Sequence, residues 1–137
     1  MVEIQNIKCG NSFEFPFNYT ERVHSDFMKF SGDDSNIHTS LDFATKNGYK
    51  GVLGYAFALT AFLSKIYGTQ FPGGNELCLK QECNFRNPFY VGDRIIFTVT
   101  VRSINYELKT LELTSSAKVD DGTLIFTGSA LLKLSLS

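Results

Sequence analysis

Tryptophan is absent from this chain of 137 residues, and cysteine and proline are scarce, with three of each. Cys78 and Cys83 stand five positions apart, wider than the usual C-x₂₋₄-C half of a zinc site, and Cys9 is distant from both in the sequence. An odd number of cysteines without metal-type spacing indicates reduced, packed thiols. We therefore expect a cytoplasmic protein without a metal site.

Long apolar runs and an excess of one charge are also missing. No apolar run approaches the ~20 residues that span a bilayer, and Met1–Gln5 lacks the basic and apolar regions of a secretory signal. The net charge of −1 argues against the basic composition of proteins that bind nucleic acid. We expect neither a membrane nor a nucleic acid as a partner.

Aromatic residues are abundant, with thirteen phenylalanines and six tyrosines, and apolar residues make up 43% of the chain. The length fits one domain, residues 1–137, with a single core rich in aromatic side chains. Periodicity and turn residues predict strands at 2–8, 12–19, 77–86, 94–104, 106–119 and 123–136, and helices at 21–30, 40–46 and 54–67. Helices followed by a long antiparallel meander indicate an α+β fold.

The segment 54–67 is apolar almost all round, which is typical of a buried helix. We therefore expect an antiparallel sheet that wraps around this central apolar helix. Pro16 predicts that the strand at 12–19 lies at an edge of the sheet, because proline cannot donate a ladder hydrogen bond.

The first helix has clear start and stop signals. Thr20 is suited to the N-cap and Gly32 to the end of the helix. Val23, Phe27 and Phe30 fall on one helical face and predict an apolar stripe, and we expect His24 to lie at the surface.

A polar loop, Phe30–His38, separates two apolar segments and contains Asp33, Asp34 and His38. Aspartates in isolation are typical of turns and caps, and a lone histidine is more often structural than catalytic. The downstream sequence decides between these interpretations.

Three motifs follow one another along the chain. Ser31-Gly32-Asp33-x-x-x-Ile37-His38 is followed by Val52-Leu53-Gly54 and then by Phe85-x-x-Pro88-x-x-Val91-Gly92-Asp93. In this order they resemble the MaoC-like hydratase/dehydratase family, whose motifs are S-x-D-x-N-P-[IL]-H, V-H-G and F-x-x-P-V-x-x-G-D.

The resemblance implies a hot-dog fold in which an overhanging helical segment carries the active-site loop. It also implies a homodimer or higher oligomer formed by joining two sheets. The implied activity is hydration of trans-2-enoyl thioesters, or dehydration of (R)-3-hydroxyacyl thioesters, linked to coenzyme A or acyl carrier protein. No nucleotide fingerprint occurs in the sequence, so we expect no cofactor beyond the coenzyme A or phosphopantetheine of the substrate.

The chain departs from the family motifs at three positions. Ser35 stands in place of the usual asparagine, Asn36 in place of proline, and Leu53 in place of histidine. Asp34-Ser35-Asn36 can also be read as the D-x-N element; we choose Asp33 as the catalytic residue because its spacing to His38 matches the family, and we take Asp34 as structural.

Hydration requires a water that loses a proton as it attacks C3, a proton for C2, and stabilisation of charge on the thioester oxygen. Asp33 and His38 can hold one water between them, and we expect burial to raise the pKa of Asp33 and to lower that of His38. The N–H of Gly54, unpaired at a helix N-terminus, is the expected oxyanion donor. Tyr55 and Phe57 are near enough in sequence to line the substrate pocket.

Two other functions remain open at this point: a hot-dog acyl thioesterase and a non-catalytic acyl-binding subunit. The carrier is open too, because an acidic acyl carrier protein would favour a basic rim. The candidate rim cations are Lys46, Lys50, Lys80 and Arg86.

Overall fold

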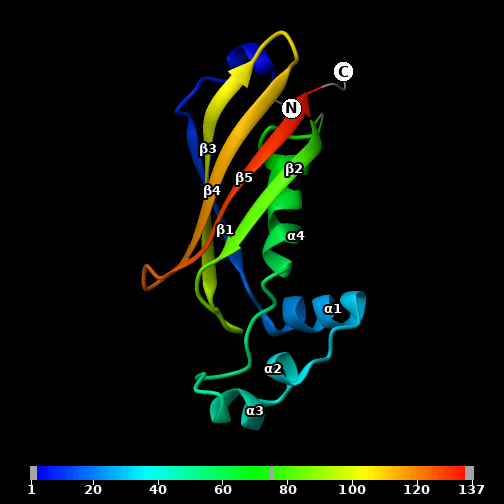
Figure 1. Ribbon diagram of the computed structural model, residues 1–137, viewed down its shortest axis with the longest axis vertical. Helices are drawn as coiled ribbons and strands as arrows, with labels where there is room; N and C mark the ends of the chain where they lie inside the picture. Colours follow the sequence, from blue (N-terminus) through cyan, green and yellow to red (C-terminus); the bar gives the residue numbers. More distant parts are fainter. Residues whose placement is uncertain (1–2, 75, 135–137) are drawn as a thin grey trace.

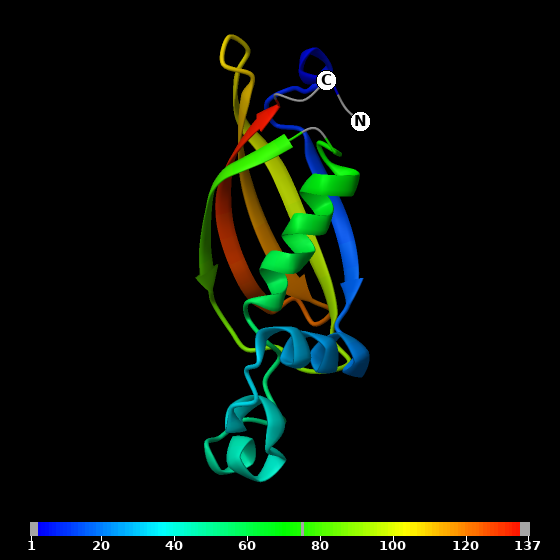
Figure 2. The same cartoon turned by 90° about the vertical axis from the view of Figure 1, so that its right-hand side faces the viewer.

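The computed structural model describes residues 3–74 and 76–134, in which a five-stranded antiparallel sheet curves around one helix (Figures 1 and 2). The strands lie side by side in the order β1-β3-β4-β5-β2, and each pair of neighbours is antiparallel. Their bounds are β1 (Ser12–Asn18), β2 (Glu76–Phe85), β3 (Arg94–Asn105), β4 (Thr110–Val119) and β5 (Leu124–Leu134). Strand β1 is an edge strand, as Pro16 predicts.

The central helix α4 (Ala58–Lys65) lies along the concave face of the sheet and continues as a π-helical turn, Ile66–Gln70 (Figure 2). Three short helices extend beyond one end of the sheet: α1 (Glu21–Ser31), α2 (Asn36–Thr39) and α3 (Leu41–Lys46). A single helix wrapped by an antiparallel sheet is the hot-dog fold. The overhanging helical segment contains the polar loop.

Local signals account for the ends of the overhanging helices. The Thr20 hydroxyl accepts a hydrogen bond from the Val23 N–H at 3.2 Å and caps α1. Gly32 ends α1 in the left-handed conformation, with φ of 75°, where glycine has no steric penalty. Ser40 caps α3 through the N–H of Phe43. The first two features confirm the predicted ends of α1, and the third places the start of α3 one residue after the beginning of the predicted helix 40–46.

The core lies between the sheet and α4. Along β3, Ile95, Phe97, Val99 and Val101 are buried and alternate with more exposed residues, as expected for a strand with one covered face. Leu59, Leu63 and Ile66 of the central helical segment pack against this face. None of the helices in residues 3–74 and 76–134 is long and apolar enough to cross a membrane.

Several sequence predictions about local structure are wrong. Within the described part of 2–8, the chain forms a 3₁₀ turn, Ile4–Asn6, and no strand. The central helix begins at Ala58, not at Gly54, and it passes Gly68 without ending there. The short helix α2 was not predicted. The last residues of the strand expected at 123–136 lie outside the described residues.

Burial also differs from expectation at several positions. Phe30 does not join the apolar stripe of α1, because it points into solvent next to the loop. The central helix has an exposed side at Ala61, Ser64 and Lys65. The cysteines are free thiols, but Cys9 and Cys78 are exposed, so the expectation of packed thiols is wrong for these two.

Candidate active site

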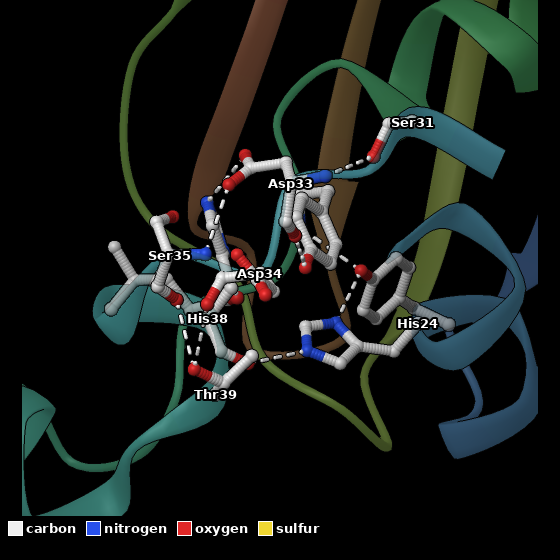
Figure 3. Close-up of polar contacts among 10 residues, drawn as sticks. His24, Ser31, Asp33, Asp34, Ser35, His38 and Thr39 are labelled. Carbon is white, nitrogen blue, oxygen red and sulfur yellow. Dashed lines mark hydrogen bonds and ion pairs between the residues drawn. The ribbon is translucent and has the colours of Figure 1, made fainter. Parts of the chain in front are cut away.

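Asp33 and His38 face one another across the loop that joins α1 to α2 (Figure 3). The Asp33 Oδ2 and His38 Nε2 atoms are 3.9 Å apart. This separation is too long for a direct hydrogen bond, but it leaves room for a water oxygen about 2.8 Å from both atoms. The His38 side chain is largely enclosed, while that of Asp33 is half exposed, so the space between them is open on the carboxylate side.

The orientation of the His38 ring is fixed on two sides. Its Nδ1 lies 2.7 Å from the carbonyl oxygen of Leu53. A carbonyl can only accept, so Nδ1 carries the hydrogen, and the Nε2 of a neutral imidazole is left with a lone pair directed at Asp33. The ring also stacks on Tyr55, with centroids 4.0 Å apart and planes 23° apart.

The Asp33 carboxylate is held by a short local turn. Its Oδ1 accepts the N–H of Ser35 at 3.1 Å, and the Asp33 N–H donates to the Ser31 hydroxyl at 3.1 Å. The Tyr55 hydroxyl donates to the carbonyl oxygen of Asp33. The same tyrosine therefore supports the ring of His38 and the backbone of Asp33.

The pKa of Asp33 lies below its ordinary value, chiefly because the Ser35 side chain and then the Ser35 N–H hydrogen-bond to the carboxylate. The positive charge of a protonated His38 lowers it further, and the small desolvation opposes these effects. The expected upward shift of this pKa is therefore wrong, because the carboxylate is too exposed for burial to dominate. Asp33 is ionised at neutral pH.

His24 is not a surface residue. It is 8% exposed and lies behind His38, where its Nε2 is 2.8 Å from the His38 carbonyl oxygen and its Nδ1 is 2.7 Å from the Tyr19 hydroxyl (Figure 3). The sequence contains a weak signal for this burial, since position 24 neighbours Val23 in a helix capped at Thr20. The hydrogen bond between His24 and Tyr19 is evident only from the tertiary structure.

Gly54 does not have the predicted free N–H. Its N–H donates to the Phe89 carbonyl oxygen at 2.7 Å, in a short antiparallel contact between Leu53 and Tyr90. The glycine is required for packing, because a Cβ at this position would overlap the ring of Phe89. The predicted oxyanion donor is therefore already paired within the chain.

The turn before α4 offers other donors. The Ala58 N–H donates to the Tyr55 carbonyl at 3.0 Å and closes a turn. Within the described residues, the N–H groups of Ala56 and Phe57 have no hydrogen-bond acceptor in the chain. Unpaired N–H groups before the first turn of a helix can stabilise negative charge.

An apolar cavity of about 240 Å³ lies beside this turn. Leu53, Gly54 and Ala56 line it together with residues 85–89. The remaining lining residues are Tyr49, Leu59 and Ile125. The third sequence motif therefore contributes Phe85 and Pro88 to the cavity.

Tyr55 and Phe57 do not line this cavity as predicted. Tyr55 is only 2% exposed and is packed between His24, Phe27 and His38. Phe57 is 68% exposed, and its ring lies 5.5 Å from that of Phe85, which places it at the rim of the cavity.

Asp34 takes no part in the pair. Its carbonyl oxygen accepts a hydrogen bond from the Thr39 hydroxyl at 3.2 Å, which ties the loop to α2. Within residues 3–74 and 76–134, no three His, Cys, Asp or Glu side chains lie close enough together to hold a metal ion. The chemistry available at this site is proton transfer through one histidine and one ionised carboxylate.

Comparisons with known proteins point to one group of enzymes. No protein-family model matches the sequence. The chain is 25% identical over 133 residues to an (R)-specific enoyl-CoA hydratase of Aeromonas caviae, with 97% of this chain and 99% of the relative covered. It is 27% identical over 129 residues to an (R)-specific enoyl-CoA hydratase of Rhodospirillum rubrum, with 92% and 87% covered.

Solved structures agree on the fold. The (R)-hydratase from A. caviae involved in PHA biosynthesis superposes with a TM-score of 0.89 at 24% identity, covering 96% of this chain and 99% of the other. The R-hydratase PhaJ1 from Pseudomonas aeruginosa also gives 0.89, at 20% identity, covering 97% of this chain and 85% of the other. The hot-dog arrangement thus extends over nearly the whole chain.

Proposed function

The chain belongs to the MaoC-like family of (R)-specific enoyl-thioester hydratases, which are hydro-lyases, and on this basis we propose that it hydrates trans-2-enoyl thioesters to (R)-3-hydroxyacyl thioesters. The reverse dehydration uses the same site. The observation that carries the proposal is the Asp33–His38 pair, whose Oδ2 and Nε2 atoms are 3.9 Å apart.

In this proposal one water lies between the two side chains. The water oxygen forms a bond to C3 while His38 Nε2 takes one of its protons, and the resulting imidazolium gives a proton to C2, which regenerates the neutral ring. The Nδ1 hydrogen bond to Leu53 favours this role, because it keeps the lone pair on Nε2. The ionised Asp33 orients the water and stabilises the imidazolium.

Negative charge develops on the thioester oxygen as C3 is attacked. The Gly54 N–H is paired with Phe89, so we assign the oxyanion contact to the N–H groups of Ala56 and Phe57 before α4. Gly54 keeps a part in thioester binding as a residue that lines the cavity, while the space of its missing side chain is filled by the Phe89 ring. One oxyanion donor is worth about 3 kcal/mol in enzymes where it has been measured.

Among the candidate rim cations, Arg86 is the one that lines the cavity. Lys46 and Lys80 are each paired with an acidic side chain, Asp42 and Glu82. Arg86 lies on the cavity wall, and we expect it to approach the phosphates of coenzyme A or of an acyl carrier protein.

We further propose that the active form is a homodimer joined through the two β2 strands. Strand β2 is an edge of the sheet, and in the single chain it exposes Leu77, Leu79 and Phe85. An exposed apolar edge strand is prone to pair with another strand, and this pairing would join the two sheets.

The test is loss of enoyl absorbance when the purified protein meets trans-2-enoyl-CoA, with chiral analysis of the product. We expect Asp33→Asn and His38→Ala to lower kcat by about 10²- to 10⁴-fold, the range typical of acid–base groups. Asp34→Asn is the matched control, because this neighbouring carboxylate lies outside the pair, and it should leave kcat unchanged.

Two results would contradict the proposal. Release of free thiol with the double bond intact would indicate a thioesterase. No reaction with short, long or carrier-bound enoyl chains would indicate a non-catalytic acyl-binding subunit.

A further inference from the structure

A second histidine, His24, is buried directly behind the Asp33–His38 pair, and the reaction proposed above does not use it. It comes from α1, whereas the carbonyl that it contacts belongs to α2. The imidazole is enclosed by aromatic rings, with its centroid 4.7 Å from that of Tyr55 and 5.7 Å from that of Tyr19. A buried polar ring in such a place needs partners for both nitrogens.

Those partners define the protonation of the ring. The His38 carbonyl can only accept, so the Nε2 of His24 carries a hydrogen and donates it over 2.8 Å. The Tyr19 hydroxyl accepts the Tyr55 N–H at 2.9 Å, so its own hydrogen is available for Nδ1 of His24 at 2.7 Å. Burial raises the pKa of Tyr19 to about 12, and this hydroxyl therefore keeps its proton at neutral pH.

The hydrogen bonds form a continuous chain, from the Tyr55 N–H to Tyr19, from Tyr19 to His24, and from His24 to the backbone of His38. Tyr55 connects this chain of hydrogen bonds to both members of the pair, since its ring stacks on His38 and its hydroxyl donates to the carbonyl oxygen of Asp33. Both members of the catalytic pair are thus tied to the same buried group of aromatic residues.

The helix that holds His38 depends on such outside contacts. Helix α2 has four residues, Asn36–Thr39, and so short a helix has little stability of its own. Two contacts beyond α2 and its caps fix its backbone: the Leu53 N–H to the Ile37 carbonyl at 3.0 Å, and His24 to the His38 carbonyl. An apolar residue at position 24 would leave the His38 carbonyl without this donor.

We infer that His24 is a positioning residue, which sets the distance between Asp33 and His38 through the Tyr19–His24–His38 hydrogen bonds. The inference rests on the proposed function, because it concerns the geometry around the attacking water. His24 touches neither the water nor the thioester in this scheme.

Three substitutions test it. His24→Leu removes both hydrogen bonds; His24→Gln keeps a donor that reaches the His38 carbonyl; and His24→Asn keeps a polar side chain too short to reach it. We expect His24→Leu and His24→Asn to lower kcat by about 10²-fold, the typical effect of a catalytic group displaced by ~1 Å, with KM near the wild-type value. His24→Gln should recover most of kcat.

A measurement that does not depend on activity accompanies the kinetics. The ¹⁵N NMR signals of the imidazoles in the unliganded protein should show His24 as the Nε2–H tautomer. The signals of His38 should shift in His24→Leu and His24→Asn and return in His24→Gln. If the wild type fails to hydrate enoyl thioesters, the proposed function is wrong, and these signals still decide whether His24 positions His38.

A purely structural role predicts a different pattern. His24→Leu would then lose thermal stability but keep wild-type kcat per folded molecule and unchanged His38 signals, and this result would overturn the inference. If His24→Leu does not fold, equal kcat values and equal His38 signals in His24→Gln and His24→Asn would overturn it instead.

Discussion

Gly54 and Phe89 contact one another twice: the Gly54 N–H donates to the Phe89 carbonyl at 2.7 Å, and the Phe89 ring fills the space where a Cβ at position 54 would lie. This pair joins the segment before the central helix to the segment 85–89, and both segments line the cavity. The ring contact explains why position 54 requires glycine. The paired N–H explains why Gly54 is not the oxyanion donor.

Gly54→Ala should therefore displace the buried Phe89 ring. We expect the free energy of unfolding to fall by about 1–3 kcal/mol, the usual cost of overpacking, as measured by urea denaturation. Phe89→Leu in the same chain should recover part of this loss, because the smaller side chain leaves room for the new methyl group. If the losses of unfolding free energy in the two single variants simply add in the double variant, the contact between the two residues is contradicted.

Ser35→Ala should raise the pKa of Asp33 toward its ordinary value of about 4, because the Ser35 side chain is the largest cause of the lowered pKa. A ¹³C NMR titration of the carboxyl carbon measures this shift. Ser31→Ala is the matched control, since the Ser31 hydroxyl accepts the Asp33 N–H and is not among the causes of the lowered pKa. It should leave the pKa of Asp33 unchanged.

The same substitution has a predictable effect on stability. A carboxyl whose pKa is lower in the folded state stabilises the fold above its unfolded pKa, and this contribution disappears as the pH falls through the folded pKa. Ser35→Ala should therefore be less stable than the wild type at pH 7, and the difference should shrink below about pH 4. A difference that grows on acidification would contradict the direction assigned to the pKa.

Tyr55→Phe keeps the ring on which His38 stacks but removes the hydroxyl that bonds to the Asp33 carbonyl. We expect the free energy of unfolding to fall by about 1 kcal/mol, the net value of one hydrogen bond, and kcat to fall while KM is kept. Tyr106→Phe, in the exposed turn between β3 and β4, is the control. Wild-type kcat in Tyr55→Phe would show that this bond does not hold Asp33 in place.

Ala56→Pro removes one of the proposed oxyanion donors. The substitution should leave the fold intact, because Ala56 is the second residue of a turn closed by Ala58 and Tyr55, a position that proline favours. We expect kcat to fall by about 10²- to 10³-fold. Ala56→Gly keeps the N–H and should stay active. Equal kcat values in the two variants would show that the Ala56 N–H is not an oxyanion donor.

Leu79→Lys should weaken the proposed dimer, because a charge on an edge strand opposes pairing with a second strand. Sedimentation velocity at a series of protein concentrations measures the change. Leu108→Lys, at another exposed leucine, in the β3–β4 turn, is the control and should assemble like the wild type. A wild-type chain that stays monomeric would exclude the β2 interface.

Local sequence determined the order of the elements and many of their ends. Alternation in β3, the caps at Thr20 and Ser40, and the left-handed Gly32 depend on residues a few positions apart, so a pattern of neighbours predicts them. The spacing of Asp33 and His38 is also local, because one short loop and one helical turn bring the two side chains together.

Tertiary structure alone decided which contacts hold the side chains of Asp33 and His38 in place. The burial of His24, the support from Tyr55 and the pairing of Gly54 with Phe89 all depend on contacts between residues far apart in the chain. The pKa of Asp33 is lowered chiefly by the neighbouring Ser35, and the position of the loop outside the sheet keeps the opposing desolvation small. Desolvation and long-range hydrogen bonds arise only once the chain is folded, so the sequence pattern identifies the reacting groups but not the contacts that hold them.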